Sequence, residues 1–172
     1  MALNEANVAL FATTRMPQRE TLFQWVGPLF THTWGFYARK GKGPRIDSMQ
    51  TARQVSAIGT YRRDGKMQYL QGIGFNNLVA SNRNQTNIVH LMRGEIDLWA
   101  SSDFTMPHLV RQAGFEPEQF ELAYPFRTVD NYIAFSKKTS PHVVRLWGNV
   151  LDEIKQDGTF ARICCKFNYR PQ

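Results

Sequence analysis

Hydroxyl and guanidinium side chains lie close together near the start of the chain, in the segment Thr13-Thr14-Arg15-Met16-Pro17-Gln18-Arg19. The segment follows an apolar run, Val8 to Ala12, which is typical of a buried strand. An arginine offers a planar fork of N–H donors that matches a carboxylate, and threonine hydroxyls are short, rigid donors. Thr13, Thr14 and Arg19 are therefore candidate partners for a carboxylate. The alternative is a surface turn followed by a solvated arginine, because most lone arginines are exposed.

Two further polar clusters follow apolar runs that read as strands, at residues 57–61 and 96–100. The first cluster contains Asp64 and Gly65, and the second contains Ser101 and Ser102. In an open α/β sheet, ligands bind beyond the carboxyl ends of the strands. The coincidence of the three clusters therefore predicts a binding cleft.

Short apolar runs alternate with helical patterns along most of the chain, and two helical patterns end it. The expected strands cover residues 8–13, 33–39, 57–61, 96–100 and 132–136. The expected helices cover residues 47–54, 65–72, 84–94 and 105–113, and two more begin near Ser140 and Thr159. This alternation predicts an α/β fold with right-handed crossovers and mainly parallel strands.

The size and charge of the chain narrow the classes of function. Its 172 residues suffice for one ordinary domain or two small lobes with a real core. Lys and Arg outnumber Asp and Glu by 21 to 14, which permits nucleic acid, an anionic surface or an anionic ligand as partner. The basic residues are scattered and not interleaved with aromatic residues, so we expect a solvated surface and no nucleic acid. No apolar stretch approaches the roughly 18 residues of a membrane span.

The cysteines and histidines are not spaced like metal ligands. The two cysteines are adjacent, Cys164-Cys165, which is poor geometry for a disulfide, and there is no CxxC spacing. We expect both to be packed thiols. The sequence predicts no metal and no cofactor.

Four segments together resemble one protein family. Phe11 to Glu20, followed by Trp25-Val26-Gly27-Pro28, is similar to the region after strand four of bacterial family 3 extracellular solute-binding proteins, the polar amino-acid receptors of ABC importers. Three more segments occur in the family's order and at its spacing: Gly94 to Trp99, Ala134 to Lys138 and Asp152 to Arg162. The resemblance implies a type II periplasmic-binding-protein-like α/β fold, in which two lobes are joined by two crossing segments and close on the ligand.

The resemblance also implies roles for the candidate site residues. Arg19 corresponds to the arginine that holds the α-carboxylate of the ligand, and Thr14 to a hydroxyl donor beside it. Asp64 and Gly65 align with a loop that opens a helix, where an acid would repel a carboxylate unless it caps that helix. Ser102 aligns with an acid that often receives the α-amino group, and serine is a weaker partner for an ammonium.

Members of the family normally begin with a signal peptide, followed by three strands and two helices of the first lobe. This chain starts just before the segment that resembles strand four, and its N-terminus lacks the features of a secretory signal. The resemblance thus implies a truncated first lobe, residues 1–33 and 131–172, and a complete second lobe, residues 34–130. Strand 8–13 and the C-terminal helices would then expose edges and apolar faces, which predicts self-association.

We therefore expect a solute-binding protein, or a fragment of one, that binds a polar amino acid or a related small carboxylate. By resemblance it is periplasmic, and a full-length relative would deliver its ligand to an ABC permease. One alternative is an enzyme on the same fold, similar to cyclohexadienyl dehydratase, which would need a positioned acid or base such as Glu20 or Asp64. Another is a sensor or interaction module without retained ligand binding. Between these, we expect the receptor and not an enzyme.

Overall fold

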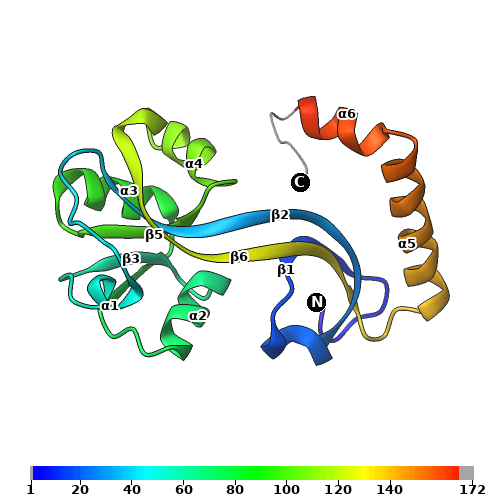
Figure 1. Cartoon of the computed structure of the whole chain (residues 1–172). Helices are drawn as coiled ribbons and strands as arrows, with labels where there is room; N and C mark the ends of the chain where they lie inside the picture. The colour runs from blue at the N-terminus through cyan, green and yellow to red at the C-terminus, as the bar shows by residue number, and fades with distance from the viewer. Residues whose placement is uncertain (1, 167–172) are drawn as a thin grey trace. The chain divides into compact units, whose positions relative to one another are not determined.

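The computed structural model describes residues 2–166, and Figure 1 shows their elements. The chain divides into two compact units: unit 1 comprises Met1–Thr31 and Val129–Gln172, and unit 2 comprises His32–Thr128. The boundaries expected from the sequence fall two residues later at both crossings. The outermost parts of the expected first lobe, residue 1 and residues 167–172, lie outside the described residues. The interpretation of these units as closing lobes stays a prediction.

Unit 2 is built around three short strands, which are β3 (Ile58–Tyr61), β4 (Leu78–Ser81) and β5 (Leu98–Ser102). β3 runs parallel to both β4 and β5. The other neighbour of β5 is β2 (Phe23–Arg39), which is antiparallel to it and places Trp34 opposite Ser102. The expectation of mainly parallel strands is therefore correct only for the three short strands.

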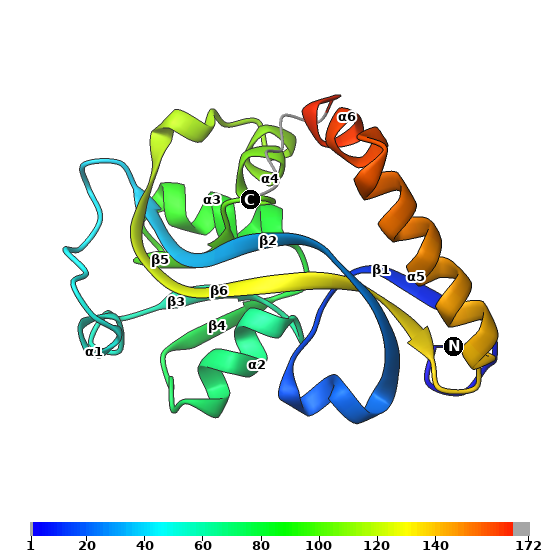
Figure 2. The ribbon, with the colours of Figure 1, turned by 45° about the vertical axis from the view of Figure 1, so that its right-hand side comes forward.

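Four helices cover the two faces of this sheet. α1 (Met49–Ala52) and α2 (Gly65–Gly72) lie on one face, and α3 (Asn84–Arg93) and α4 (Met106–Gln112) lie on the other, as Figures 1 and 2 both show. The residue that follows α3 is Gly94, whose φ of 76° is the left-handed conformation that commonly ends a helix. Each of α2, α3 and α4 follows a strand. The sequence predicts this for α2 and α4, whereas β4, the strand before α3, is not among the expected strands.

Both faces of the sheet are buried, because successive residues of a strand point to opposite sides. Phe36 of β2 and Leu98 of β5 pack in one core together with Leu70 of α2. Their strand neighbours Tyr37 and Trp99 pack in a second core. The helix residues of that second core are Ile88, Leu91 and Val110.

Unit 1 combines a strand pair with two helices. β1 (Ala9–Thr14) is antiparallel to β6 (Phe120–Ser136), which is preceded by a short 3-10 helix, η2 (Pro117–Gln119). The helices are α5 (Pro141–Gln156) and α6 (Thr159–Lys166). Ser140 caps α5 as predicted, since its hydroxyl accepts a hydrogen bond from the His142 backbone N–H at 3.3 Å. The small core of the unit contains Val26, Ile133, Phe135 and Leu151.

The hydrogen-bonded order of the strands is β1-β6-β2-β5-β3-β4. β2 and β6 are each 17 residues long and contribute residues to both units. The sequence predicts only parts of these strands, residues 33–39 and 132–136, because their remaining residues alternate irregularly between buried and exposed positions. β1 is the terminal strand of the order, so one of its edges has no strand partner among residues 2–166.

Large apolar side chains are exposed on unit 1. They include Leu146, Trp147 and Val150 of α5 and Phe11 of β1, which is 60% exposed. The rings of Phe11 and Trp147 meet edge to face, with centroids 5.9 Å apart. The sequence predicts exposed apolar faces on these elements, and self-association through them stays a prediction.

The two adjacent cysteines differ in exposure. Cys164 is buried and Cys165 is exposed, and both are free, so the expectation of two packed thiols is wrong for Cys165. Burial raises the pKa of the Cys164 thiol above its ordinary value.

Within the part of the chain that the structure describes, no helix is both long and apolar enough to cross a membrane.

Two leucines of α5 give a matched test of which face of the helix is buried in solution. Leu151 is 6% exposed and Leu146 is 48% exposed. We expect Leu151→Ala to lower the free energy of unfolding by about 2–5 kcal/mol, because it empties part of the core. Leu146→Ala should change it by no more than about 0.5 kcal/mol. Urea titration followed by circular dichroism measures both, and an equal loss for Leu146→Ala would mean that its face is covered in solution.

Candidate functional site

The candidate hydroxyls of unit 1 both donate hydrogen bonds within the unit. Thr14 lies opposite Asn131 in the β1–β6 pair, and its hydroxyl donates to the Asn131 side-chain oxygen at 2.8 Å. The Thr13 hydroxyl donates to the Leu10 carbonyl at 3.3 Å, across an irregularity in the strand pairing where Ala12 has a φ of 53°. Because a hydroxyl has one proton to donate, each would have to rotate to donate to a ligand carboxylate.

Arg15 is committed to an acid on the following helical turn. Its Nε donates to Glu20 Oε2 at 2.8 Å, and a second guanidinium nitrogen pairs with Glu20 Oε1. The guanidinium carbon also lies 5.1 Å from the centre of the Tyr132 ring and 5.7 Å from that of Trp25. The hydrogen bond from Arg15 holds the pKa of the Glu20 carboxyl below its usual value, and the same contact raises the pKa of Arg15.

Arg19 lies in the 3-10 helix η1 (Pro17–Leu22), which directly follows β1. Its backbone N–H donates to the Met16 carbonyl at 2.8 Å, and its side chain is half-buried. Met16 is almost fully buried and anchors the start of this turn. The structure therefore brings Thr14, Arg15 and Arg19 into one short segment of unit 1, in which Arg15 already has a carboxylate.

Asp64 of unit 2 caps α2. Its Oδ1 accepts a hydrogen bond from the Met67 backbone N–H at 2.8 Å, and its Oδ2 lies 2.7 Å from Lys66 Nζ. Gly65 is the first residue of the helix. Both side chains of the ion pair are less than one-fifth exposed. The sequence leaves open whether Asp64 caps this helix, and the hydrogen bond to Met67 shows that it does. Lys66 balances the charge of Asp64.

Ser101 and Ser102 are buried at the end of β5. The Ser102 hydroxyl accepts a hydrogen bond from the Thr105 backbone N–H at 3.2 Å and lies 2.8 Å from the Thr105 hydroxyl. The neighbouring acid, Asp103, accepts from the Thr33 backbone N–H at 2.9 Å. The two Ser102 contacts close the turn between β5 and α4, and the Asp103 contact ties the end of β5 to β2. Because a carboxylate can accept several hydrogen bonds, Asp103 keeps acceptor capacity.

A group of cations and aromatic rings in unit 2 extends this region, and we call it the cation–aromatic cluster. Its members are Trp34, Lys66, Tyr69, Phe126 and Arg127. The Arg127 guanidinium carbon lies 4.4 Å from the centre of the Tyr69 ring and 6.0 Å from that of Trp34, and Lys66 Nζ lies 5.6 Å from the Trp34 ring centre. The Tyr69 and Phe126 rings are stacked at 6.1 Å with an interplanar angle of 6°. No sequence pattern predicts this cluster, because its members are far apart in the chain.

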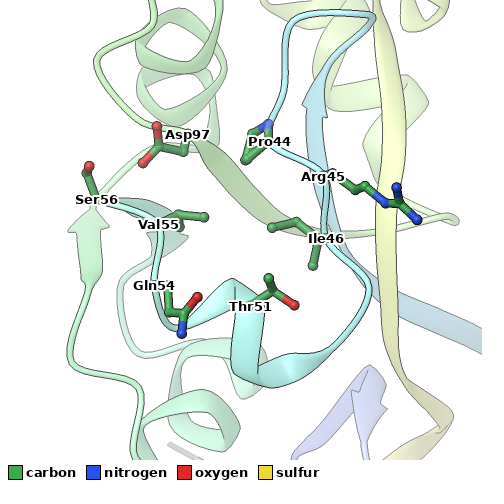
Figure 3. A pocket seen from close by; sticks show the side chains of 8 residues that line it. All are labelled: Pro44, Arg45, Ile46, Thr51, Gln54, Val55, Ser56 and Asp97. Carbon is green, nitrogen blue, oxygen red and sulfur yellow. The ribbon is translucent and has the colours of Figure 1, made fainter.

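A separate hollow of about 310 Å³ in unit 2 is lined by the residues labelled in Figure 3. It includes Val55 and Asp97, which precede β3 and β5, so it lies at the amino ends of these strands and not at their carboxyl ends. Asp97 is tied to the backbone, since its Oδ2 accepts from the Ala57 N–H at 2.9 Å. Arg45 is directed away from the other lining side chains (Figure 3). This hollow is therefore distinct from the predicted site.

No cluster of residues that could hold a metal ion occurs among the residues that the structure describes.

The predicted site residues lie in two groups, one in each unit. Thr13, Thr14 and Arg19 form the group of unit 1. Asp64, Gly65, Ser101 and Ser102 lie at the carboxyl ends of β3 and β5 in unit 2. Their role in binding stays a prediction.

Comparison with known proteins places the fold. No protein-family model matches the chain, and no curated protein matches it. A histidine kinase sensor domain with similarity to periplasmic binding proteins superposes with a TM-score of 0.81 and 14% identity, covering 92% of this chain and 68% of that one. A mutant of ArgBP from T. maritima gives a TM-score of 0.78 and 15% identity, covering 91% of this chain and 66% of that one. An ancestral amino acid-binding protein, a precursor of cyclohexadienyl dehydratase, superposes with a TM-score of 0.73 and 15% identity, covering 91% of this chain and 66% of that one.

The chain therefore has a periplasmic-binding-protein-like α/β fold, as the sequence resemblance predicts. It spans about two thirds of the length of these structures.

The cap of α2 can be tested by comparing two replacements of Asp64. We expect Asp64→Ala to lower the free energy of unfolding by about 0.5–2 kcal/mol, because the Met67 N–H loses its partner. Asp64→Ser should stay close to wild type, because serine is also a good N-cap residue. Chemical denaturation measures both; equal stability of all three proteins would show that the cap contributes nothing.

The contact between Arg15 and Glu20 predicts a pH effect. Replacing Arg15 by Met should raise the pKa of Glu20 toward its ordinary value, because the hydrogen bond to the ionised carboxylate is lost. In the wild type this lowered pKa stabilises the fold above the ordinary pKa of a glutamate, and the contribution disappears as the pH falls through the lowered value. NMR titration of the Glu20 carboxyl carbon measures the shift. An unchanged Glu20 pKa in Arg15→Met would contradict the pairing.

Proposed function

We propose that this chain is a solute-binding protein, or part of one, that binds a polar amino acid or a related small carboxylate. The observation that carries the proposal is the likeness in fold, over about nine-tenths of the chain, to ArgBP from T. maritima. That protein has also been solved with arginine bound. The sequence resemblance to amino-acid receptors points in the same direction.

The chemistry of the two residue groups supports binding of a carboxylate. In unit 1, Arg19 supplies a guanidinium, and Thr13 and Thr14 supply hydroxyls that can reorient toward an acceptor. In unit 2, the acid at the start of α2 is balanced by Lys66, so it does not present an uncompensated negative charge.

We further propose a periplasmic location, and an ABC permease as the partner of a full-length relative. These two points rest on the family resemblance alone. An ABC importer needs the receptor to release its ligand to the permease, so moderate affinity and reversible binding are expected of this chain.

An enzyme on the same fold is the second candidate, because the ancestral protein reported above is a precursor of cyclohexadienyl dehydratase. The two acids that the sequence offers for such chemistry are engaged. Glu20 is held ionised by Arg15, and Asp64 caps α2 and pairs with Lys66. A general acid needs a pKa near the working pH. The hydrogen bond from Arg15 instead moves the pKa of Glu20 further below that pH. We therefore propose binding without turnover, and loss of a cyclohexadienyl acid in the presence of the protein would contradict this.

A thermal-shift screen of amino acids and small carboxylates tests the proposed function. We expect at least one polar ligand to raise the melting temperature of the wild type; at a concentration of 100 times Kd, the stabilisation is about 2.7 kcal/mol. Arg19→Ala should lose most of this ligand-dependent shift, because the carboxylate loses its charged partner.

The matched control is Arg93→Ala. Arg93 lies at the end of α3 with its side chain 69% exposed, and it should keep the full shift. A ligand that stabilises Arg19→Ala as much as the wild type would remove Arg19 from the site. If no compound in the screen stabilises the wild type, the proposed function is wrong.

A further inference from the structure

A hollow of about 320 Å³ lies in unit 1, between β2 and α5. β2 contributes residues 25–27 to its lining, and α5 contributes six residues between Val144 and Asp152. These six positions follow the helical repeat, so they form one face of α5. Both lining segments belong to unit 1, so the hollow is built within a single unit.

Gly148 keeps this hollow open. It lies in the interior of α5, where glycine is the least favourable residue after proline. A Cβ built on Gly148 would meet no atom within 4 Å, so close packing does not require a glycine here. Gly27 differs, because its φ of 145° and the Tyr132 ring, 2.7 Å from a built Cβ, both require glycine. The bare backbone of Gly148 therefore leaves room for a group from outside the unit.

The hollow borders a free edge of β2. In the order of the strands β2 lies between β6 and β5, but its pairs with β5 cover only residues 34–37. No described residue of β6 lines the hollow, so it lies on the other side of β2. On that side residues 25–27 have no strand partner in the described part of the chain, and an unpaired edge can accept an added strand. The next carbonyl, that of Pro28, already accepts a hydrogen bond from Lys155 Nζ of α5 at 2.7 Å.

The floor of the hollow is apolar and its rim carries two charges. Val26 and Leu151 of the lining belong to the core of unit 1. Arg145 and Asp152 are exposed, and neither takes part in an ion pair with another described residue. They are seven positions apart, which is about 10.5 Å along a helix, and Gly148 lies between them.

We propose that this hollow binds an extended segment of another protein, which adds as a strand to the free edge of β2. The segment carries an apolar residue over Gly148, an acid two positions to one side against Arg145, and a base two positions to the other side against Asp152. Strand residues two positions apart point to the same face, and four positions span about 13 Å. Long side chains therefore reach rim charges about 10.5 Å apart.

The sequence of the chain argues against a second copy as the occupant. The proposed pattern needs an acid and a base four positions apart with an apolar residue midway. Arg93 and Asp97 are the only acid and base at that distance in the 172 residues, and the residue midway between them is Glu95. The partner is therefore a different protein. This inference does not rest on the proposed function.

NMR with short peptides, on the full chain labelled with ¹⁵N, tests the inference. The probe is acetyl-Glu-Thr-Val-Thr-Lys-amide, and acetyl-Lys-Thr-Val-Thr-Glu-amide covers the opposite strand direction. One control peptide replaces the central valine by glycine, and another replaces both charged residues by glutamine. We expect at least one probe to shift the backbone amide signals of Val26, Gly27 and Gly148. The amide signal of Val79 in β4, which is also a terminal strand, should stay unmoved.

Two glycine variants form a matched pair. Gly148→Leu fills the hollow and should abolish the shifts, and its melting temperature should be at least that of the wild type because leucine favours a helix. Gly72→Leu, at the end of α2 in unit 2, also has no atom within 4 Å of a built Cβ. It should bind the probe like the wild type.

Two charge variants test the rim. Arg145→Gln and Asp152→Asn each remove one charge and should each weaken binding of the probe about twofold to fivefold, the range of an exposed ion pair. Binding of the glutamine control peptide should stay unchanged in both variants.

The outcomes decide the inference. Saturable binding of a probe that Gly148→Leu removes supports it. It is wrong if neither probe shifts the three signals, if Gly148→Leu binds like the wild type, or if a control peptide binds as tightly as the probe. Concentration-dependent dimerisation in sedimentation that Gly148→Leu abolishes would also overturn it, because a second copy would then be the occupant. In the thermal-shift screen of amino acids Gly148→Leu should behave like the wild type, so failure of the proposed function is seen separately.

Discussion

The burial of both faces of the sheet in unit 2 is the constraint on which the rest of that unit depends. Phe36 and Leu98 fill one core, and their strand neighbours Tyr37 and Trp99 fill the other. Because neither face can be left in water, each strand must be followed by a helix that returns over one face. The turns from β3 into α2 and from β5 into α4 are then fixed at one edge. Asp64, Gly65, Ser101 and Ser102 lie at that edge for this reason.

The polar groups of the candidate site have partners within their own units. Thr14 bonds to Asn131, Asp64 to the Met67 N–H, and Ser102 to the Thr105 N–H. These bonds hold the side chains in fixed positions, which is what a binding site needs before its ligand arrives. They also cost the site part of its hydrogen-bonding capacity. Within the cation–aromatic cluster, Lys66 pairs with Asp64, whereas no acid among residues 2–166 forms an ion pair with Arg127.

Local signals in the sequence predicted much of the fold. Ser140 with Pro141 marks the start of α5, and Gly94 marks the end of α3, because capping and left-handed glycines act over a few residues. The family resemblance, carried by four short segments, predicted the fold that the structural comparisons confirm. The sequence alone does not show whether Asp64 caps α2 or presents an uncapped carboxylate to a ligand. The hydrogen bond from the Met67 N–H shows that Asp64 is the cap.

Contacts between residues that are distant in the chain cannot be predicted from local sequence patterns. Trp34 and Arg127 lie on different strands with most of unit 2 between them, and no spacing rule connects them. The antiparallel pairing of β2 with β5 was missed for a similar reason, since strand direction depends on the path of the whole chain. The N-terminal parts of β2 and β6, residues 23–32 and 120–131, lack a regular alternation of buried and exposed residues. A search for a period of two residues therefore does not detect them.

The register of β1 on β6 has a consequence for biosynthesis. Ala9 pairs with Phe135, so β1 waits for a partner that is synthesised 126 residues later. All of unit 2 is synthesised in that interval as one continuous stretch, His32–Thr128. At about 5–20 residues per second, the nascent N-terminal strand carries the uncovered ring of Phe11 for several seconds or more. Unit 2 can therefore fold before the β1–β6 pair of unit 1 forms, and β1 stays accessible to a chaperone during that interval.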